Sequence, residues 1–312
     1  MKTVVEIKFD ALRVPGGADA ILGPSQCTEE VVEVTHYKAL GRTDITVVLG
    51  EHDERVSKLM ALLAAVDEKP FVIHTDIYTE DERQTAPLLI LQPWGHVRAW
   101  GGPRLGTSYD IAQACQRCGT GARQTSDMII ANDDVRRIEK LRIAATTFEN
   151  VLLNDDDVDR LITAQVSGAL FWPVHAKTKA GNMKELRRQQ VCVEHVLPPM
   201  APSSHLDRTQ VCPSCRRGCF THVAFHPLRL VYRRQDLANI QDINLTWEWF
   251  GDYAGSPEEA LAGRWPDPLI LITPKVMNLL RGKTKKEQKS QGCDFIPIWI
   301  EDDTHDKPYL LT

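Results

Sequence analysis

The cysteines constrain this chain more than any other feature of its sequence. There are 8 among 312 residues, and four of them form two C-x-x-C pairs, Cys115 with Cys118 and Cys212 with Cys215. The first residues alternate in polarity and include Glu6, whereas a secretory signal needs a continuous apolar run. We therefore predict a cytoplasmic protein, and in a reducing compartment paired cysteines more often bind metal than form disulfides.

Composition narrows the class of protein and of partner. With 43% hydrophobic and 25% charged residues, the chain has ordinary globular values, which exclude a disordered, collagen-like or coiled-coil protein. No window of about 18 apolar residues occurs, so we expect no transmembrane helix and no membrane partner. The formal net charge of −5 disfavours binding to nucleic acid and favours a basic partner.

Hydrophobic patterns predict an α+β fold with two domains. Apolar or β-branched runs predict strands over 4–9, 45–49, 71–77 and 88–91, and helical spacing predicts a helix over 51–66. A stretch rich in Gly, Pro and Trp then interrupts the periodicity. We predict a small N-terminal α/β module over 1–92, a linker over 93–106, and a second domain over 107–312.

The second domain contains two similar segments, about 148–175 and 267–300. Each reads as a strand, a short helix and then the pattern G-x-x-F-x-P-[V/I], which starts at Gly168 and at Gly292. Each also follows a C-x-x-C pair, and a Lys-rich stretch over 283–289 accounts for the extra length of the second segment. The sequence therefore predicts a duplicated strand-helix-strand region that carries zinc-ribbon-like knuckles.

A local metal site is predicted around the second cysteine pair. Cys192 and His195 form a C-x-x-H pair, which a turn-rich loop separates from Cys212 and Cys215. Two ligands three residues apart fit one tight knuckle, and two facing knuckles complete the tetrahedral shell that structural zinc prefers. We rank this site first and expect one Zn²⁺ per chain. The competing interpretation makes Cys192 a buried small side chain and His195 a surface residue.

Cys115 and Cys118 have no second ligand pair nearby in the sequence. They could join the second C-x-x-C pair in a four-cysteine site, which would leave the C-x-x-H pair unused. They could also be the remnant of a first zinc site, or take ligands from Cys27 or His36. The local site ranks higher because its loop closes over fewer residues, although the entropy of closure grows slowly with loop length.

The motifs give little support to an enzyme. Cys192, Glu194 and the following C-x-x-C pair resemble the pattern of zinc deaminases, in which the glutamate shuttles protons. That pattern needs helix starts, whereas Pro198 and Pro199 prevent a helix after the first segment, and Val211 stands where the pattern has proline. No P-loop, nucleophile elbow or H-E-x-x-H motif occurs. We predict a non-enzymatic protein and keep a zinc-dependent hydrolase or deaminase as the third interpretation.

The order of these parts resembles the double-CXXCG motif family, a set of bacterial immunity-type paralogues. The resemblance covers about 107–312 and leaves out the N-terminal module. It implies an immunity protein that binds and neutralises a cognate toxin of a contact-dependent or polymorphic toxin system, with metal in an architectural role. The chain departs from the pattern at Arg216, which follows Cys215 where the family has glycine.

Two further functions are weighed against each other. The leading expectation is a zinc-stabilised protein that binds a cognate, basic toxin, and the aromatic segment over 247–253 is a candidate anchor for such an interface. The alternative is a zinc-ribbon regulator or nucleic-acid adaptor. It would use the basic residues of the second domain, which are Arg216, Arg217, Arg229, Arg233, Arg234 and the Lys-rich stretch over 283–289.

Overall fold

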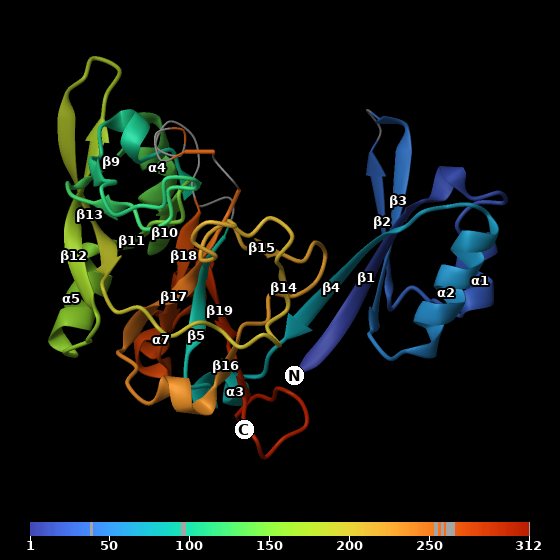
Figure 1. Ribbon diagram of the computed structural model, residues 1–312. Helices are drawn as coiled ribbons and strands as arrows, with labels where there is room; N and C mark the ends of the chain where they lie inside the picture. Colours follow the sequence, from blue (N-terminus) through green and yellow to red (C-terminus); the bar gives the residue numbers. More distant parts are fainter. Residues whose placement is uncertain (38–39, 95–97, 253–254, 257–258, 260–265, 312) are drawn as a thin grey trace. The chain divides into compact units, whose positions relative to one another are not determined.

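The computed structural model describes all residues except 38–39, 95–97, 253–254, 257–258, 260–265 and 312 (Figure 1). It confirms the α+β class, since helices and several sheets occur together. The chain divides into two compact units, which we call unit 1 (1–79 and 223–228) and unit 2 (80–222 and 229–312). Within the described residues no helix has the length and apolar character needed to cross a membrane.

Unit 1 is a four-stranded antiparallel sheet with two connecting helices. The sheet order is β2-β3-β1-β4, and the chain order is strand, helix, two strands, helix, strand, which is the ferredoxin-like arrangement. Val5, Ile7 and Phe9 alternate along β1 and are buried in one core with Leu59 and Leu63 of α2. The elements are β1 (Lys2–Asp10), α1 (Asp19–Ser25), β2 (Val32–Tyr37), β3 (Arg42–Gly50), α2 (Glu54–Ala65) and β4 (Phe71–Ile77).

Unit 1 contains most of what the N-terminal patterns predicted. The strands expected over 4–9, 45–49 and 71–77 and the helix over 51–66 are present as β1, β3, β4 and α2. The sequence did not reveal α1, which is short and contains Pro24, or β2, whose side chains are mostly exposed and so show no apolar alternation.

In its described residues, unit 2 contains two larger sheets and three two-stranded ones. The six-stranded sheet has the order β6-β10-β11-β13-β12-β9, and the four-stranded sheet has the order β17-β18-β5-β19. The helices are α3 (Glu80–Thr85), α4 (Val135–Ile138), α5 (Asp155–Thr163), α7 (Pro274–Leu280) and α8 (Lys285–Lys289). The strands are β5 (Leu89–Pro93), β6 (Arg98–Ala99), β7 (Tyr109–Asp110), β8 (Arg123–Gln124), β9 (Met128–Ala131), β10 (Ile143–Thr146), β11 (Val151–Asn154), β12 (Ala169–Lys177), β13 (Met183–Val193), β14 (Leu206–Asp207), β15 (Thr221–His222), β16 (Val231–Arg233), β17 (Ile243–Phe250), β18 (Asp267–Ile272), β19 (Cys293–Pro297) and β20 (Trp299–Glu301).

The two sheets of unit 2 share one arrangement of strands and helix, which is the arrangement that a duplication would produce. Four neighbouring strands in one have the order β10-β11-β13-β12, with α5 between β11 and β12 in the chain. The other has β17-β18-β5-β19, with α7 between β18 and β19. We call these the first and second repeats. They differ in the origin of the third strand, which follows β12 in the first repeat but is the earlier β5 in the second.

The position of β5 changes the predicted domain boundary. The strand expected over 88–91 was assigned to a module of residues 1–92, but β5 pairs with β18 and β19 and belongs to unit 2. In Figure 1 it is the teal strand among the orange and red ones. The expected linker over 93–106 is also part of unit 2 where it is described, because β6 pairs with β10; its residues 95–97 lie outside the described residues.

Two equivalent backbone hydrogen bonds join the repeats, one in each direction. Ile143, which starts β10, donates its N–H to the carbonyl of Gln291 (2.9 Å), and Ile243, which starts β17, donates to Ser167 (3.0 Å). The next residues, Gly292 and Gly168, have φ of 89° and 90°, and a Cβ on either would overlap an isoleucine carbonyl oxygen. These are the glycines of the repeated G-x-x-F-x-P pattern. The two repeats also share one hydrophobic core, which includes Val158, Leu161, Val276, Met277 and Leu280.

Candidate metal centre

Each C-x-x-C pair lies in a turn enclosed by a short antiparallel hairpin. The first lies between β7 and β8, and the second between β14 and β15. In the first turn Cys115 donates its N–H to the carbonyl of Thr120 (2.8 Å), and its own carbonyl accepts from Gly119 (2.8 Å). In the second, Cys212 donates to Gly218 (3.0 Å) and accepts from Arg216 (2.8 Å). Both knuckles therefore share the hydrogen bond from the fourth residue after the first cysteine, and the second knuckle closes one residue later than the first.

The backbone also explains the departure at Arg216. Gly119 has a φ of 77°, the left-handed conformation that suits glycine, and Arg216 takes the same region with a φ of 54°. The second knuckle therefore closes without the glycine that the double-CXXCG pattern has at this point.

The four cysteines converge on one point. The sulfurs of Cys115 and Cys212 are 3.8 Å apart, those of Cys118 and Cys215 are 3.7 Å apart, and all four lie within 4.8 Å of one another. A tetrahedral ion with metal–sulfur bonds of about 2.3 Å requires sulfurs separated by about 3.8 Å. The site therefore fits a metal ion, and the knuckle that precedes each repeat in the chain supplies one pair of ligands. Among the described residues, these four form the group with metal-binding geometry.

Burial and charge favour a cation at this point. Cys118 and Cys212 are fully buried, whereas Cys115 and Cys215 are partly exposed. Burial raises the pKa of Cys215 to about 12 and raises that of Cys212 as well. Burial acts in the same direction on Cys115, but N–H donors from Arg117 and Cys118 lower its pKa to about 7. Buried thiolates repel one another, so a divalent cation is the partner that lets all four carry charge.

The first-ranked set of ligands is not the one that the structure assembles. Cys192 lies in β13 opposite Leu170 of β12, and burial raises the pKa of its thiol to about 12. Because β13 continues through Cys192 to Val193, the backbone makes no knuckle there. The carbonyl of His195 accepts from Leu245 of β17 (2.8 Å), and neither residue belongs to the four-cysteine group. The structure brings together the four cysteines of the alternative, and the half-buried Cys192 lies outside that group.

The remaining predicted ligands lie elsewhere. Cys27 is buried in the core of unit 1, and His36 on β2 contacts the Thr43 hydroxyl (3.2 Å). Glu194, the proton shuttle of the deaminase interpretation, is exposed and pairs with Arg123 (3.6 Å). The residues of that pattern are therefore not gathered around the metal position.

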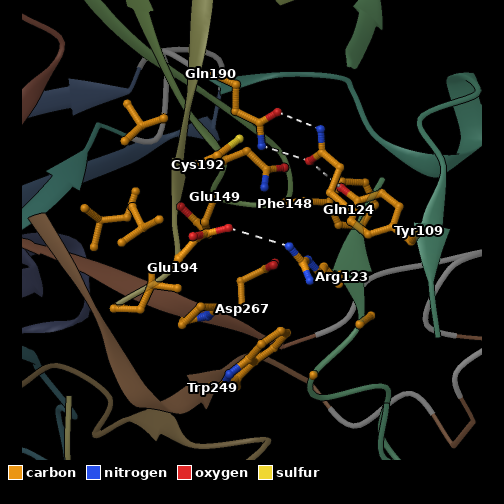
Figure 2. Close-up of a pocket in the computed structure, with 18 of the residues that line it drawn as sticks. Tyr109, Arg123, Gln124, Phe148, Glu149, Gln190, Cys192, Glu194, Trp249 and Asp267 are labelled. Atoms are coloured by element: carbon orange, nitrogen blue, oxygen red, sulfur yellow. Dashed lines mark hydrogen bonds and ion pairs between the residues drawn. The ribbon is translucent and has the colours of Figure 1, made fainter. Parts of the chain in front are cut away.

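A cleft of about 610 Å³ is lined by both repeats and was not predicted (Figure 2). Gln124 and Gln190 lie side by side in its lining and exchange two amide hydrogen bonds of 2.8 Å. Trp249 of β17 and Asp267 lie in another part of the lining. Cys192, which was expected to bind metal, also lines this cleft. The aromatic segment over 247–253 was the available signal, although Tyr253 lies outside the described residues.

No family model matches this chain, and a search of the curated proteins finds no match either. What the centre can do therefore follows from its geometry. Four protein sulfurs fill a tetrahedral shell and leave no position for substrate or water, which is the arrangement of a structural metal rather than a catalytic one.

Proposed function

We propose that the protein is a non-enzymatic, zinc-stabilised protein-binding protein. The observation that carries this proposal is the shared four-cysteine centre, in which Cys115 and Cys118 of one knuckle meet Cys212 and Cys215 of the other. Four soft thiolates in tetrahedral geometry favour zinc among the common divalent ions. One Zn²⁺ per chain would then join the two repeats, and its role is to hold a surface in shape.

The partner that we propose is a cognate bacterial toxin, so that the protein acts as an immunity protein. Support comes from the resemblance to the double-CXXCG family and from two copies of the same strand-helix-strand unit, each associated with one knuckle. The net charge of −5 suits a basic toxin. The cleft beside the centre offers the aromatic side chains Trp172 and Trp249 with acidic neighbours Glu194 and Asp267, a composition that suits protein interfaces.

The nucleic-acid adaptor receives less support. Arg233 and Arg234 form ion pairs with Glu301 (3.5 Å) and Asp302 (3.1 Å). Arg217 donates to the carbonyl of Trp247 (2.6 Å) and lies over the rings of two tryptophans. Side chains engaged in this way present little free positive charge to phosphates.

Co-expression with the toxin encoded beside the gene tests the proposal. We expect the wild type to form a complex with that toxin in a pull-down and to rescue growth, because an immunity protein occupies the toxin surface. Cys212→Ser should fail to rescue, while Cys192→Ala, which keeps all four ligands, should rescue like the wild type. Absence of both complex and rescue would refute the immunity role, and salt-sensitive binding of nucleic acid at physiological ionic strength would favour the adaptor instead.

A further inference from the structure

The cleft of about 610 Å³ in unit 2 has one side formed by two paired strands of the first repeat. Trp172 of β12 lies opposite Gln190 of β13, and Leu170 lies opposite Cys192. Strand alternation places these four side chains on one face of the sheet, and all four line the cleft. The volume lies in the range of about 300–1,000 Å³ that is typical of ligand sites. This side of the cleft therefore offers a ligand an apolar surface with one amide.

Gln190 brings further hydrogen-bonding capacity to the cleft. The residue is 4% exposed, and its amide exchanges two hydrogen bonds with that of Gln124, which also donates to the carbonyl of Ser126 (2.7 Å). An amide offers two N–H donors and two acceptor positions. With Gln124 as its partner among the described residues, the Gln190 amide keeps one donor and one acceptor for a ligand. A peptide suits it, because a peptide has both N–H and carbonyl groups.

The charged side chains of the lining favour a cationic ligand. They are three carboxylates and two guanidinium groups, those of Glu149, Glu194, Asp267, Arg123 and Arg217. Glu149 pairs with Arg98 (2.8 Å), and Arg217 donates to the carbonyl of Trp247 (2.6 Å). Beside them lie two further acids, Glu194 and Asp267, and one further base, Arg123. This part of the cleft therefore attracts a cation more than an anion.

Arg123 shows how the cleft receives a guanidinium group. Its Nη2 lies 3.6 Å from Oε1 of Glu194, and the two side chains are 78% and 70% exposed. Figure 2 shows the guanidinium directed towards Glu194, with Asp267 in the same lining. An ion pair between side chains so exposed contributes little to stability. A guanidinium group from another protein can therefore replace that of Arg123 beside Glu194 with little loss.

Tryptophan rings in the lining also suit a guanidinium group. Within the protein, the guanidinium of Arg217 already lies over the ring of Trp249, 5.8 Å from its centre. Planar guanidinium groups stack on aromatic rings and are attracted to their faces. Trp172 contributes another ring to the cleft. Carboxylates and aromatic rings together therefore favour arginine over an uncharged side chain.

We propose that this cleft binds an arginine side chain of a partner protein. The incoming guanidinium replaces that of Arg123 beside Glu194. Its aliphatic stem packs against Trp172, and the peptide backbone bonds to the amide of Gln190. This inference rests on the proposed protein-binding function and specifies which side chain of the partner the cleft recognises.

NMR titration of the zinc-loaded full chain with two short peptides tests the proposal. One is a blocked glycine-arginine-glycine tripeptide, and the other has citrulline in place of arginine, which keeps the shape of the side chain without its charge. Zinc is kept in place because the N–H of Arg217 donates to the sulfur of Cys215 (3.5 Å), which joins the cleft to the metal centre. We expect the arginine peptide to shift the indole N–H signals of Trp172 and Trp249, and the citrulline peptide to bind at least about threefold more weakly.

Removal of Arg123 gives the sharpest prediction. Arg123→Ala should bind the arginine peptide about two- to fivefold more tightly than the wild type does, because the competing guanidinium is gone. Lys184→Ala is the matched control, since it removes an exposed cation of β13 that lies outside the lining, and it should bind like the wild type. Glu194→Gln, at a largely exposed position, should weaken binding by about two- to fivefold.

Two results would overturn the proposal. One is equal affinity for the two peptides, and the other is an Arg123→Ala variant that binds no more tightly than Lys184→Ala. The peptide results are separate from those with the toxin. A protein that forms the toxin complex but fails the peptide tests would overturn this inference and leave the proposed function standing. Peptide binding as expected, without a toxin complex or rescue, would refute the immunity role alone.

Discussion

In both repeats of unit 2, the residue just before the first strand forms an ion pair with the helix of the same repeat. This residue is basic in the first repeat and acidic in the second. Just before β10, Arg142 pairs with Asp157 of α5, and its carbonyl accepts the N–H of Asn154 (3.2 Å). Just before β17, Asp242 pairs with Lys275 of α7 (2.9 Å), and its carbonyl accepts the N–H of Thr273 (2.9 Å). The backbone contact is the same while the charges are exchanged.

The pairs also differ in burial, and this difference shows which features the duplicated fold requires. The side chains of Arg142 and Asp157 are 9% and 1% exposed, whereas those of Asp242 and Lys275 are 18% and 47% exposed. Both repeats have the hydrogen bond from the residue that precedes the helix to the residue that precedes the first strand, and both follow a knuckle. These recurring features define the fold. The sign and depth of the ion pair are free to differ, provided that each charge has a partner.

The largest predicted effect is the loss of stability when a metal ligand is removed, and it should be equal for the two knuckles. Because each knuckle supplies half of one ligand set, Cys115→Ser and Cys212→Ser should each lower the free energy of unfolding by about 4 kcal/mol or more, measured by urea denaturation of the metal-loaded protein. Cys192→Ala is the control and should keep the metal. A loss confined to the second knuckle would support the local Cys192 and His195 site instead.

The next effect should be unequal between the repeats. Asp157→Asn leaves the buried guanidinium of Arg142 without its counter-charge and should cost about 3–5 kcal/mol in unfolding free energy. Lys275→Ala removes a half-exposed partner of Asp242 and should cost about 1 kcal/mol or less. Equal losses in the two variants would show that the difference in burial has no energetic consequence.

Substitutions of the two glycines that contact the other repeat should lower the free energy of unfolding by similar amounts. A side chain at Gly168 or Gly292 meets a carbonyl oxygen of the other repeat and adopts a disfavoured φ, so either alanine variant should cost about 2–4 kcal/mol. Gly181→Ala is the matched control, because it has a φ of 86° with no atom near the added Cβ, and about 1 kcal/mol is expected. Thermal unfolding compares the three variants, and a control as damaging as the others would mean that backbone strain alone is responsible.

The smallest effect concerns a carboxylate that only the second repeat buries in its first strand. Burial raises the pKa of Glu248 on β17, whereas β10 has no ionisable side chain. The folded state therefore holds this proton more tightly than the unfolded state, and stability falls as pH rises from the unfolded pKa through the raised folded one.

Glu248→Gln keeps an oxygen that accepts from Met200 (2.8 Å) and removes the charge. It should gain stability relative to the wild type as pH rises through that window, by on the order of 1 kcal/mol. Urea denaturation at a series of pH values measures the gain, with the exposed Glu185→Gln as control. A difference that does not change with pH would contradict the assignment.

Hydrophobic patterns in the sequence predicted several strands and helices correctly, because these elements depend on residues close together in the chain. β4 begins and ends at the residues expected from its apolar run, and the strand-helix-strand units appear where the repeated motif lies. The run over 88–91 is a strand, but it joins the second repeat, because apolar residues indicate burial and do not specify the neighbouring strand.

The ligand set was predicted less well for a related reason. Cys192 and His195 have knuckle spacing, but β13 extends through Cys192, and strand pairing prevents the turn that the spacing suggested. The pair whose sulfurs lie beside those of the second pair is 97 residues earlier in the chain, in the knuckle that precedes the first repeat. Only the association of the repeats brings the two pairs together, and spacing within one segment carries no information about it.

X-ray absorption at the metal edge tests most directly whether one ion joins the repeats through four cysteines. The expected result is one zinc per chain with four sulfur neighbours at about 2.3 Å and no nitrogen neighbour. Three sulfurs with one nitrogen at about 2.0–2.1 Å would place His195 in the shell and contradict the shared centre, as would a folded, stable protein that binds no metal.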